Sequence, residues 1–392
     1  MKLLFVKPGL AWPRASGHDV HTFYAMQACA ALGHEIGLVT KSPPAPDAIA
    51  GLPLAFTACL DGRSSGERVT LTGLQERFRS YWGVDPAALA ALRQDVRAYR
   101  PDAVVIVGLD ALPFLGSVDG PVRIWYAADE WVWHHLSLVQ PLVPGTYSHV
   151  RAAAIKGVYE RAYAPLIDRA WVVSETERRA MRWLAGVAEV DVFPNGVDAT
   201  HFSPLPDIRP EPRTAVFWGR LDFEPNIQGL EWFCRRVWPS VRAAVPDARL
   251  TIIGFRPMAE VQALARLDGV ELLADVPDLR ADVQRRGVAV LPFVSGGGIK
   301  NKLLEAAAMA VPVVCTPRAL SGLRSPSRDG LISASDAREW VEALTRLWSS
   351  SGERDRAGAA ARAWVVEHHS WEAGARAAMA GLASEPAMRR AS

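Results

Sequence analysis

The sequence contains no long hydrophobic run. No stretch of its 392 residues approaches the roughly 18 consecutive apolar residues that a membrane-spanning helix needs. The apolar part of the opening MKLLFVKPG is too short for a secretory signal peptide. We therefore expect a cytoplasmic protein, and we leave open a weak peripheral contact with the inner face of a membrane.

Cysteine is scarce, and charge of neither sign is in excess. The four cysteines lie far apart and form no C-x-x-C or metal-ligand spacing, which predicts free thiols in a reducing compartment. Lysine and arginine together number 44 against 42 acidic residues, so the net charge of +2 gives no basis for general nucleic-acid binding. We expect neither disulfides nor a nucleic-acid partner.

What the sequence does contain is apolar residues, 49% of the total, in a chain too long for one core. Buried-strand patterns alternate with helical periodicity, which predicts an α/β protein with parallel sheets. The clearest predicted strands are 3–6, 35–40, 102–107, 122–127, 169–173, 189–193, 214–218, 249–253, 287–291 and 311–315. Predicted helices are 18–32, 151–164, 175–184, 225–244 and 359–382.

One segment divides this alternation into two halves. Residues 199–213, ATHFSPLPDIRPEPR, hold four prolines and no periodic pattern, which is typical of a linker. We therefore predict a first Rossmann-like domain over 1–200 and a second over 201–369. A C-terminal helix at about 370–390 is predicted to pack back on the first domain.

The segment LPFVSGGGIKNKLLEAAAMAVPVVCT, residues 291–316, is the most informative in the chain. A strand leads into Gly296–Gly298, and a helix carrying Lys302 and Glu305 follows. Backbone N–H groups at a helix start favour an anion, and the glutamate suits ligand hydroxyls. The pattern matches neither a Walker loop nor the dinucleotide fingerprint. It predicts a nucleotide-sugar site, with an ordinary structural turn as the alternative.

Other candidate residues follow the predicted strands. They are found after residues 6, 127, 173, 193 and 218, in the loops that hold Gly17, Asp129, Ser174, Asn195–Gly196 and Gly219–Arg220. In open parallel sheets, ligands bind at the carboxyl ends of strands. This convergence is stronger evidence for a ligand site than any single motif.

Several segments together resemble the retaining glycosyltransferases of family four. These are FPNGVD (193–198), VFWGRLDFEPNIQGLEWF (216–233), VWPSVRAAVPDARLTIIG (237–254), VELLADVPDLRADV (270–283) and the glycine segment, in the order found in the family. The resemblance covers nearly all of the second half and extends to the first half mainly in layout. It implies a GT-B fold, in which two doubly wound Rossmann-like domains face a central cleft, and a nucleotide diphosphate-sugar donor.

The resemblance also implies roles for individual residues on the donor side. Arg220 would bind the diphosphate, unless it forms only a surface ion pair; Glu305 would hold the ribose hydroxyls, unless it is a solvated helix carboxylate. The remaining implied donor residues are Gly17, Asn195, Gly196, Gly219, Gly297, Gly298, Ile299 and Lys302. For Asn195–Gly196 the alternative is a plain turn.

Two departures from the family pattern concern charge at this site. The family usually has a lysine five or six residues after the arginine, where this chain has Pro225 and Asn226. The family also usually has a pair of spaced glutamates. Glu305 is at the position of the second one, and this chain has Gly297 at the position of the first. We expect Lys302 or Lys300 to supply the missing cation, and the identity of the donor sugar stays open.

The acceptor side is predicted in the first domain. Asp129 is expected to orient the sugar or the acceptor, with capping of the next helix as its alternative. The remaining acceptor-side candidates are His18, Glu130, Trp131 and His134. Arg220 and Lys302, with Asp129, form the predicted catalytic set. Because the sequence has no D-x-D signature in a suitable place, we predict no metal and no cofactor, the nucleotide-sugar being a substrate.

These residues together predict a glycosyltransferase that acts with retention on a hydroxyl acceptor, a sugar or a lipid-linked group, in cell-surface polysaccharide or glycoconjugate synthesis. A sugar-nucleotide epimerase and a catalytically degenerate partner subunit remain alternatives. One further hypothesis is that a face of basic and aromatic residues binds anionic lipid. The alternative is that these residues form an ordinary solvated helix surface. The face would comprise Arg77, Arg79, Trp82, Arg93, Arg97 and Arg100.

Overall fold

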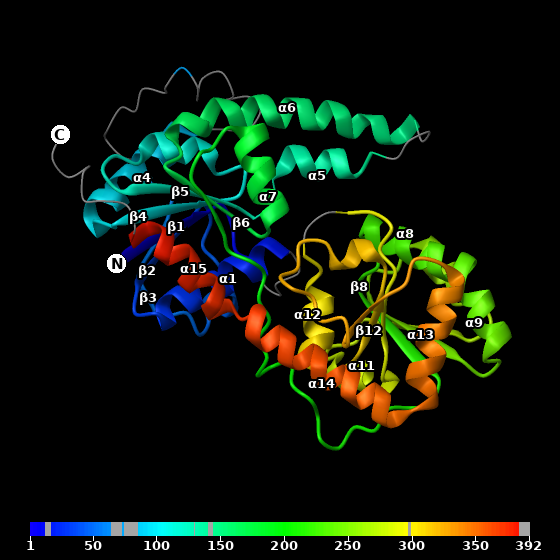
Figure 1. The fold of residues 1–392 in the computed structure, drawn as a ribbon. Helices are drawn as coiled ribbons and strands as arrows, with labels where there is room; N and C mark the ends of the chain where they lie inside the picture. Colours follow the sequence, from blue (N-terminus) through cyan, green and yellow to red (C-terminus); the bar gives the residue numbers. More distant parts are fainter. Residues whose placement is uncertain are drawn as a thin grey trace. The chain divides into compact units, whose positions relative to one another are not determined.

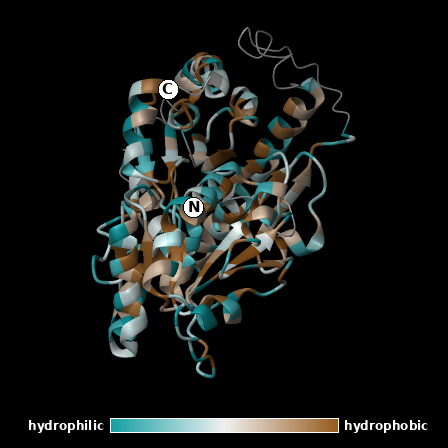
Figure 2. Cartoon of the chain, turned by 90° about the vertical axis from the view of Figure 1, so that its right-hand side faces the viewer, coloured by the Kyte–Doolittle hydropathy of each residue, from teal (hydrophilic) through white to brown (hydrophobic). Residues whose placement is uncertain are grey.

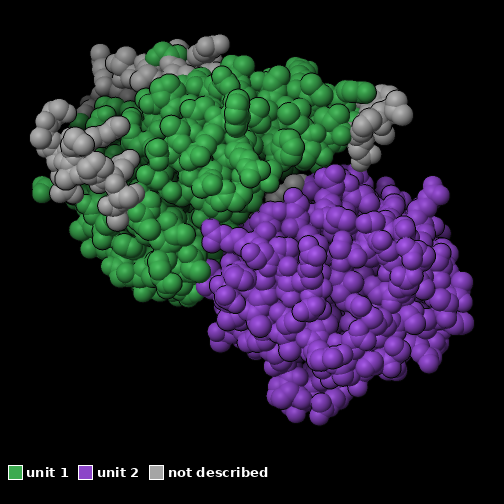
Figure 3. All heavy atoms as spheres, in the orientation of Figure 1, with its two compact units in different colours: residues 1–194, 371–392 green, residues 195–370 purple. Residues whose placement is uncertain are grey.

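The computed structural model describes residues 1–11, 17–63, 73, 85–128, 130–139, 144–296 and 299–383. The chain divides into two compact units, which Figure 3 colours separately. Unit 1 comprises residues 1–194 and 371–392, and unit 2 comprises residues 195–370. The division after Pro194 precedes the proline-rich segment that sequence composition marks as the boundary, so the whole segment belongs to unit 2.

Unit 1 is built on a parallel sheet with the strand order β3-β2-β1-β4-β5-β6-β7. Its strands are β1 (Lys2–Lys7), β2 (Glu35–Thr40), β3 (Leu54–Cys59), β4 (Ala103–Val107), β5 (Val122–Ala128), β6 (Arg169–Val172) and β7 (Val190–Val192). The order reverses at β1, which pairs with β2 on one side and β4 on the other. Strand reversals of this kind create the ligand-binding crevice of doubly wound folds.

Helices cover both faces of this sheet. They are α1 (Gly17–Ala31), α2 (Pro46–Ile49), α4 (Pro86–Tyr99), η1 (Leu112–Ser117), α5 (Trp131–Ser137), η2 (Pro144–Tyr147), α6 (Ser148–Tyr163), η3 (Ala164–Leu166), α7 (Glu175–Ala180), the π-helical turn η4 (Met181–Ala185) and α15 (Trp371–Ala383). In Figure 1, α4 and α6 lie on one face and α1 and α15 on the other.

Alternation along the buried strands supplies a separate core to each face of this sheet. Leu4 and Val6 of β1 join the cluster under α4 and α6, whereas Leu3 and Phe5 join the cluster under α1 and α15. Because successive side chains of a strand point to opposite faces, a continuous apolar strand requires cover on both sides. Figure 2 shows the strands largely brown and the helices mixed brown and teal.

Unit 2 repeats the architecture with the strand order β10-β9-β8-β11-β12-β13. Its strands are β8 (Thr214–Arg220), β9 (Arg249–Phe255), β10 (Val270–Ala274), β11 (Ala289–Leu291), β12 (Val313–Cys315) and β13 (Leu331–Ser333). Its helices are α8 (Glu224–Trp232), the π-helical turn η5 (Phe233–Val237), α9 (Trp238–Ala244), α10 (Ala259–Leu264), α11 (Arg280–Arg286), α12 (Asn301–Ala308), η6 (Pro317–Leu320), α13 (Ala337–Ser349) and α14 (Ser351–His368). The strand order reverses between β8 and β11.

Two predicted helices prove to be interrupted. The helix predicted over 225–244 changes to the π-helical turn η5 and then restarts at Trp238, because Pro239 cannot donate a backbone hydrogen bond to the preceding turn. The helix predicted over 359–382 is two helices, α14 and α15, separated at His369 and Ser370. The chain passes from unit 2 back to unit 1 at this break.

His369 fixes the end of α14 within unit 2. Its side chain is fully buried, and its Nε2 accepts a hydrogen bond from the Arg324 N–H at 3.3 Å. The Nδ1–H then donates to the Asn195 carbonyl at 3.0 Å, and the His369 carbonyl accepts from the Val197 N–H. Burial lowers the pKa of His369 to about 4, so the neutral ring is the form that this arrangement holds.

No helix in the described part of the chain is long and apolar enough to cross a membrane. The longest described helix, α14, carries charged residues along much of its length.

Candidate functional site

We name the turn that follows Gly219 and Arg220, the last two residues of β8, the Gly-Arg turn. It meets the first turn of α12 at the carboxyl edge of the unit 2 sheet. Gly219 is the second-last residue of β8 and has a φ of +141°, in the region that favours glycine. A Cβ atom on Gly219 would lie 2.8 Å from the Lys302 ammonium nitrogen. The positive φ therefore favours glycine at this position, and the absence of a side chain leaves room for a cation beside the Gly-Arg turn at the strand reversal.

Lys302 is held in place by three neighbouring side chains. Its Nζ donates to the Asn226 Oδ1 at 2.8 Å and lies 4.7 Å and 5.0 Å from the ring centroids of Phe217 and Phe293. Burial lowers its pKa to about 7, and Glu305 opposes the shift only in part. A buried ammonium has lost its hydration, so an anionic ligand bound beside it would stabilise its charged form.

Asn226 occupies a position where the family usually has lysine. Its Nδ2 donates to the Arg220 carbonyl at 2.6 Å, while its Oδ1 accepts from Lys302. One amide therefore ties the Gly-Arg turn to the α12 lysine. Between the two expected substitutes for the missing cation, the structure places Lys302 beside the turn, whereas the Lys300 ammonium contacts the Gly296 carbonyl at 3.3 Å.

Arg220 forms a bidentate ion pair with Asp222. Its Nε donates to Oδ1 at 2.9 Å and its Nη2 to Oδ2 at 3.1 Å, and these hydrogen bonds raise the pKa of Arg220 and lower that of Asp222. The side chain of Arg220 remains 46% exposed. The pairing uses the Nε–Nη2 edge of the guanidinium and leaves Nη1 outside these two bonds. A surface ion pair and an anion-binding role are therefore compatible here.

Glu305 is not a solvated helix carboxylate. It is half-buried one turn into α12, and its Oε2 accepts a hydrogen bond from the Trp218 indole N–H at 2.8 Å. Burial raises its pKa, while the bond from Trp218 and the charge of Lys302 oppose the rise. Because the indole N–H donates to Oε2, a ligand hydroxyl would donate its hydrogen bond to Oε1 of Glu305.

The Asn195–Gly196 turn lies in unit 2 and also reaches α12. The Asn195 Nδ2 donates to the Asn301 Oδ1 at 2.5 Å, and Gly196 is buried. Ile299 is 8% exposed and packs into the core of unit 2. Gly297 and Gly298 lie outside the described residues. The donor-side roles of all these residues stay predictions.

The acceptor-side candidates gather at the carboxyl edge of the unit 1 sheet. Gly17, which is predicted to bind the donor, begins α1 beside them, and the rings of His18 and Trp131 lie 5.9 Å apart. The rings of Trp131 and His134 lie 5.4 Å apart. Asp129 lies outside the described residues. The residue that caps α5 is Glu130, whose Oε2 accepts from the Trp133 N–H at 2.6 Å.

Glu130 belongs to a buried carboxylate cluster that sequence patterns did not reveal. Glu130 and Glu160 are both fully buried, and the Glu130 N–H donates to the Glu177 carboxylate at 2.6 Å. Burial, together with the neighbouring Glu130 carboxylate, raises the pKa of Glu160 to about 10. The Trp131 backbone and the charge of Lys156 oppose this rise in part, and the Lys156 ammonium lies over the Trp131 ring at 4.3 Å. Glu160 therefore holds a proton at neutral pH.

Glu160→Gln is expected to stabilise the protein at alkaline pH. The native state keeps the Glu160 proton up to about pH 10, whereas the unfolded chain releases it near 4.5, so wild-type stability falls as pH rises between these values. Glutamine has no proton to lose. Urea unfolding should give nearly equal midpoints at pH 4, where both states hold the proton, and a free energy of unfolding about 1 kcal/mol or more higher for the variant at pH 8.5.

Glu175→Gln is the matched control for this change, because Glu175 is half exposed on α7 and pairs with Arg178. It should shift the free energy of unfolding little at either pH. A Glu160→Gln variant that is as stable as wild type at pH 8.5, or less stable, would contradict the protonated assignment.

No group of three or more His, Cys, Asp or Glu side chains among the described residues could hold a metal ion. The four cysteines are free, and three of them are buried. For the predicted basic aromatic face, Arg97 and Arg100 of the α4 region are exposed and Arg93 is half-buried. Arg77, Arg79 and Trp82 lie outside the described residues.

Sequence patterns missed Trp218 as a site residue, although a signal was present. Trp218 lies on a buried strand immediately before Gly219, and a buried indole N–H needs an acceptor. The sequence could not show that this acceptor is Glu305, because 87 residues separate the two.

Comparison with known proteins now defines the class of this molecule. A model described as Glycosyltransferase Family 4 matches residues 15–201, and a model described as Glycosyl transferases group 1 matches residues 212–350. Together with the two parallel-sheet units, these matches show a glycosyltransferase with the GT-B fold. The chain belongs to the group 1-type glycosyltransferases.

Solved structures share the fold at low sequence identity. Sucrose-phosphate synthase from Thermosynechococcus elongatus has a TM-score of 0.70 at 18% identity, covering 97% of this chain and 98% of that one. Anabaena HepE, in complex with UDP and glucose, has a TM-score of 0.65 at 11% identity, and the match covers 98% of this chain and 100% of the HepE chain.

A curated relative matches part of the chain. It is described as an uncharacterized 44.6 kDa protein in the cps region of Klebsiella pneumoniae, and it is 30% identical over 129 residues. The match covers 31% of this chain and 33% of the relative, so the chain spans about a third of that protein's length.

Proposed function

We propose that the protein transfers a sugar, with retention of configuration, from a nucleotide diphosphate-sugar to a hydroxyl acceptor. The observation that carries the proposal is the clustering of Arg220, Lys302 and Glu305 at the strand reversal of unit 2. Two cations and one oriented carboxylate suit a ligand that bears both phosphates and hydroxyls. Retention is proposed from the family resemblance.

The main task of such a site is to stabilise the departing nucleoside diphosphate. Negative charge concentrates on the leaving phosphate as the bond to the sugar breaks, and preorganised cations lower the energy of that state. Lys302 and Arg220 would supply these cations, because Asn226 and Asp222 already hold them beside the Gly219 turn. We propose that transfer requires no metal, and EDTA should leave the rate unchanged.

Glu305 would bind the hydroxyls of the donor ribose. Its second oxygen is available to accept while Trp218 holds the first. HepE, which shares the fold, is in complex with UDP and glucose, which supports a uridine nucleotide as the first donor to test. The relative in a cps region supports a role in polysaccharide synthesis.

A donor screen followed by an acceptor assay tests the proposal. A nucleotide sugar at a hundred times its Kd should add roughly 2.7 kcal/mol to the free energy of unfolding, which a thermal shift detects. Acceptor-dependent release of nucleoside diphosphate is then expected. Release without any acceptor, with a changed sugar, would support an epimerase, and binding without turnover would support a degenerate partner subunit.

Trp218→Phe is expected to weaken donor binding about tenfold. The change removes the hydrogen bond that the Trp218 indole donates to Glu305 while it keeps an aromatic ring in the core, and a bond to a charged group contributes about 1.5–3 kcal/mol. Titration of nucleotide sugar by calorimetry measures the change in Kd. Trp238→Phe is a matched control, since this buried indole donates to the Asp268 carbonyl, and it should leave the Kd unchanged.

A further inference from the structure

The exposed hydrophobic side chains of unit 1 are concentrated on one segment. Apart from Met1, every exposed large hydrophobic residue in the described part of unit 1 lies between residues 133 and 183. Trp183 is 80% exposed and Val158 is 52% exposed. We name these residues the α5–α6 patch: Trp133, Leu136, Tyr147, Val150, Ile155, Val158 and Trp183. Large apolar patches on a soluble surface mark interaction sites.

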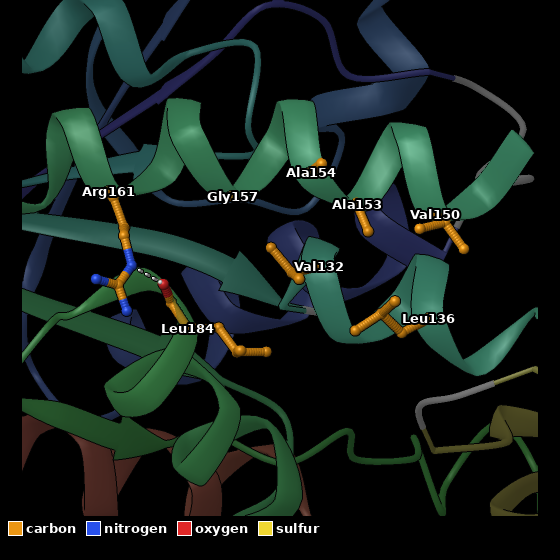
Figure 4. Close-up of a pocket in the computed structure, with 8 residues that line it drawn as sticks. All are labelled: Val132, Leu136, Val150, Ala153, Ala154, Gly157, Arg161 and Leu184. Atoms are coloured by element: carbon orange, nitrogen blue, oxygen red, sulfur yellow. Dashed lines mark hydrogen bonds between the residues drawn. The ribbon is translucent and has the colours of Figure 1, made fainter.

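A hollow of about 340 Å³ lies within the patch. Figure 4 shows it between α5, α6 and η4, with Leu136 of α5 and Val150 of α6 on its border. Its lining is apolar except for Arg161. The patch therefore combines projecting side chains with an open apolar depression.

Arg161 joins α6 to η4 at the edge of this hollow. Its Nε donates to the Leu184 carbonyl at 2.7 Å and its Nη2 to the Trp183 carbonyl at 2.9 Å. These bonds hold the backbone that carries Trp183, so the most exposed indole of the described chain projects from a fixed position. An indole is suited to a membrane–water interface, where one end of the ring is apolar and the other is wet.

The charge around the patch is positive. The exposed cations on α6, α7 and η4 are Arg151, Arg161, Arg179 and Arg182. The one exposed carboxylate on these elements, Glu175, pairs with Arg178 at 2.6 Å. Glu160 and Glu177 are buried. An apolar surface with a basic rim complements a layer that is apolar inside and anionic at its surface.

We propose that the α5–α6 patch docks on an anionic lipid bilayer. Trp183 and Val158 would enter the interface between headgroups and acyl chains, and the four arginines would contact lipid phosphates. A protein partner would need an apolar site for the exposed indole and negative charge opposite the four arginines. An anionic bilayer offers apolar acyl chains and anionic headgroups over its whole surface. The proposal rests on unit 1 alone and does not depend on the donor chemistry of unit 2.

Vesicle flotation tests this docking. The wild-type chain should float with vesicles that contain one-third phosphatidylglycerol in phosphatidylcholine, and it should remain at the bottom with pure phosphatidylcholine. The double variant Val158→Glu, Trp183→Glu should lose flotation, because it places two carboxylates against the acyl boundary. The control Val366→Glu alters a side chain of unit 2 that is 47% exposed, and it should float as wild type does.

A second pair of variants tests the basic rim. Arg179→Gln with Arg182→Gln should lower the partition coefficient by at least about tenfold, and added salt should lower the wild-type value similarly. Circular dichroism and nucleotide-induced thermal shift check that each variant is folded. Equal flotation with neutral and anionic vesicles, or wild-type flotation of the double glutamate variant, would overturn the proposal. A dimer in light scattering that the same variant dissociates would assign the patch to a second copy instead.

Discussion

Arg220→Ala should lower kcat/KM for sugar transfer by at least about a hundredfold while the melting temperature stays near that of wild type. The guanidinium is permanently charged and can bind phosphate bidentately, and removal of one preorganised donor to a developing anion costs about this factor. The side chain is 46% exposed, so its truncation leaves no buried cavity. Initial rates at several donor concentrations separate kcat from KM.

Two further variants make this test specific. Glu305→Ala should impair transfer mainly through donor binding, because Glu305 is expected to contact the ribose and not the reacting bond. Arg256→Ala is the control, since Arg256 also faces Asp222, at 3.8 Å, with a side chain that is 81% exposed. It should retain activity. Near-wild-type activity in both Arg220→Ala and Glu305→Ala would refute the site assignment.

Donor affinity should fall as pH rises above neutrality, by up to about tenfold per pH unit. In the free protein the pKa of Lys302 is lowered to about 7, so the ammonium is largely deprotonated at pH 8.5. A bound diphosphate favours the charged form, so binding above pH 7 requires uptake of one proton. Calorimetric titration of the nucleoside diphosphate between pH 6.5 and 8.5, in buffers of different ionisation enthalpy, measures both the affinity and the proton.

Lys302→Met should abolish this pH dependence as well as weaken binding. Methionine keeps an unbranched side chain beside Phe217 and Phe293 but cannot bind a proton there. Lys300→Met is the matched control on the same segment, and it should keep the slope. A wild-type slope in Lys302→Met would mean that the proton is taken up elsewhere, and Lys302 would then not face the diphosphate.

Much of the fold could be predicted from local patterns. The strand predicted at 35–40 coincides with β2, and the strands at 122–127 and 169–173 differ from β5 and β6 by one residue. These strands are buried on both faces and read as continuous apolar runs. The partly exposed strands β3 and β10 have mixed burial patterns and were not predicted.

The order of the strands, however, depends on contacts between distant residues. β1 lies between β2 and β4, and β8 lies between β9 and β11. The reversal at β8 places Gly219 near α12, which is why a glycine motif at 219 and a lysine at 302 belong to one cluster. The spacing of residues along the chain does not predict this strand order.

The sequence by itself determined the residue types that a sugar-nucleotide enzyme needs, since glycine turns, basic residues and buried strands are local features. Only the tertiary structure decided which of them act together. It paired Lys302 with Asn226 and Glu305 with Trp218, it buried Glu160 against Glu130, and it exposed Trp183. The physical reason is that charge, desolvation and hydrogen bonding depend on distance in space, which the folded chain alone establishes.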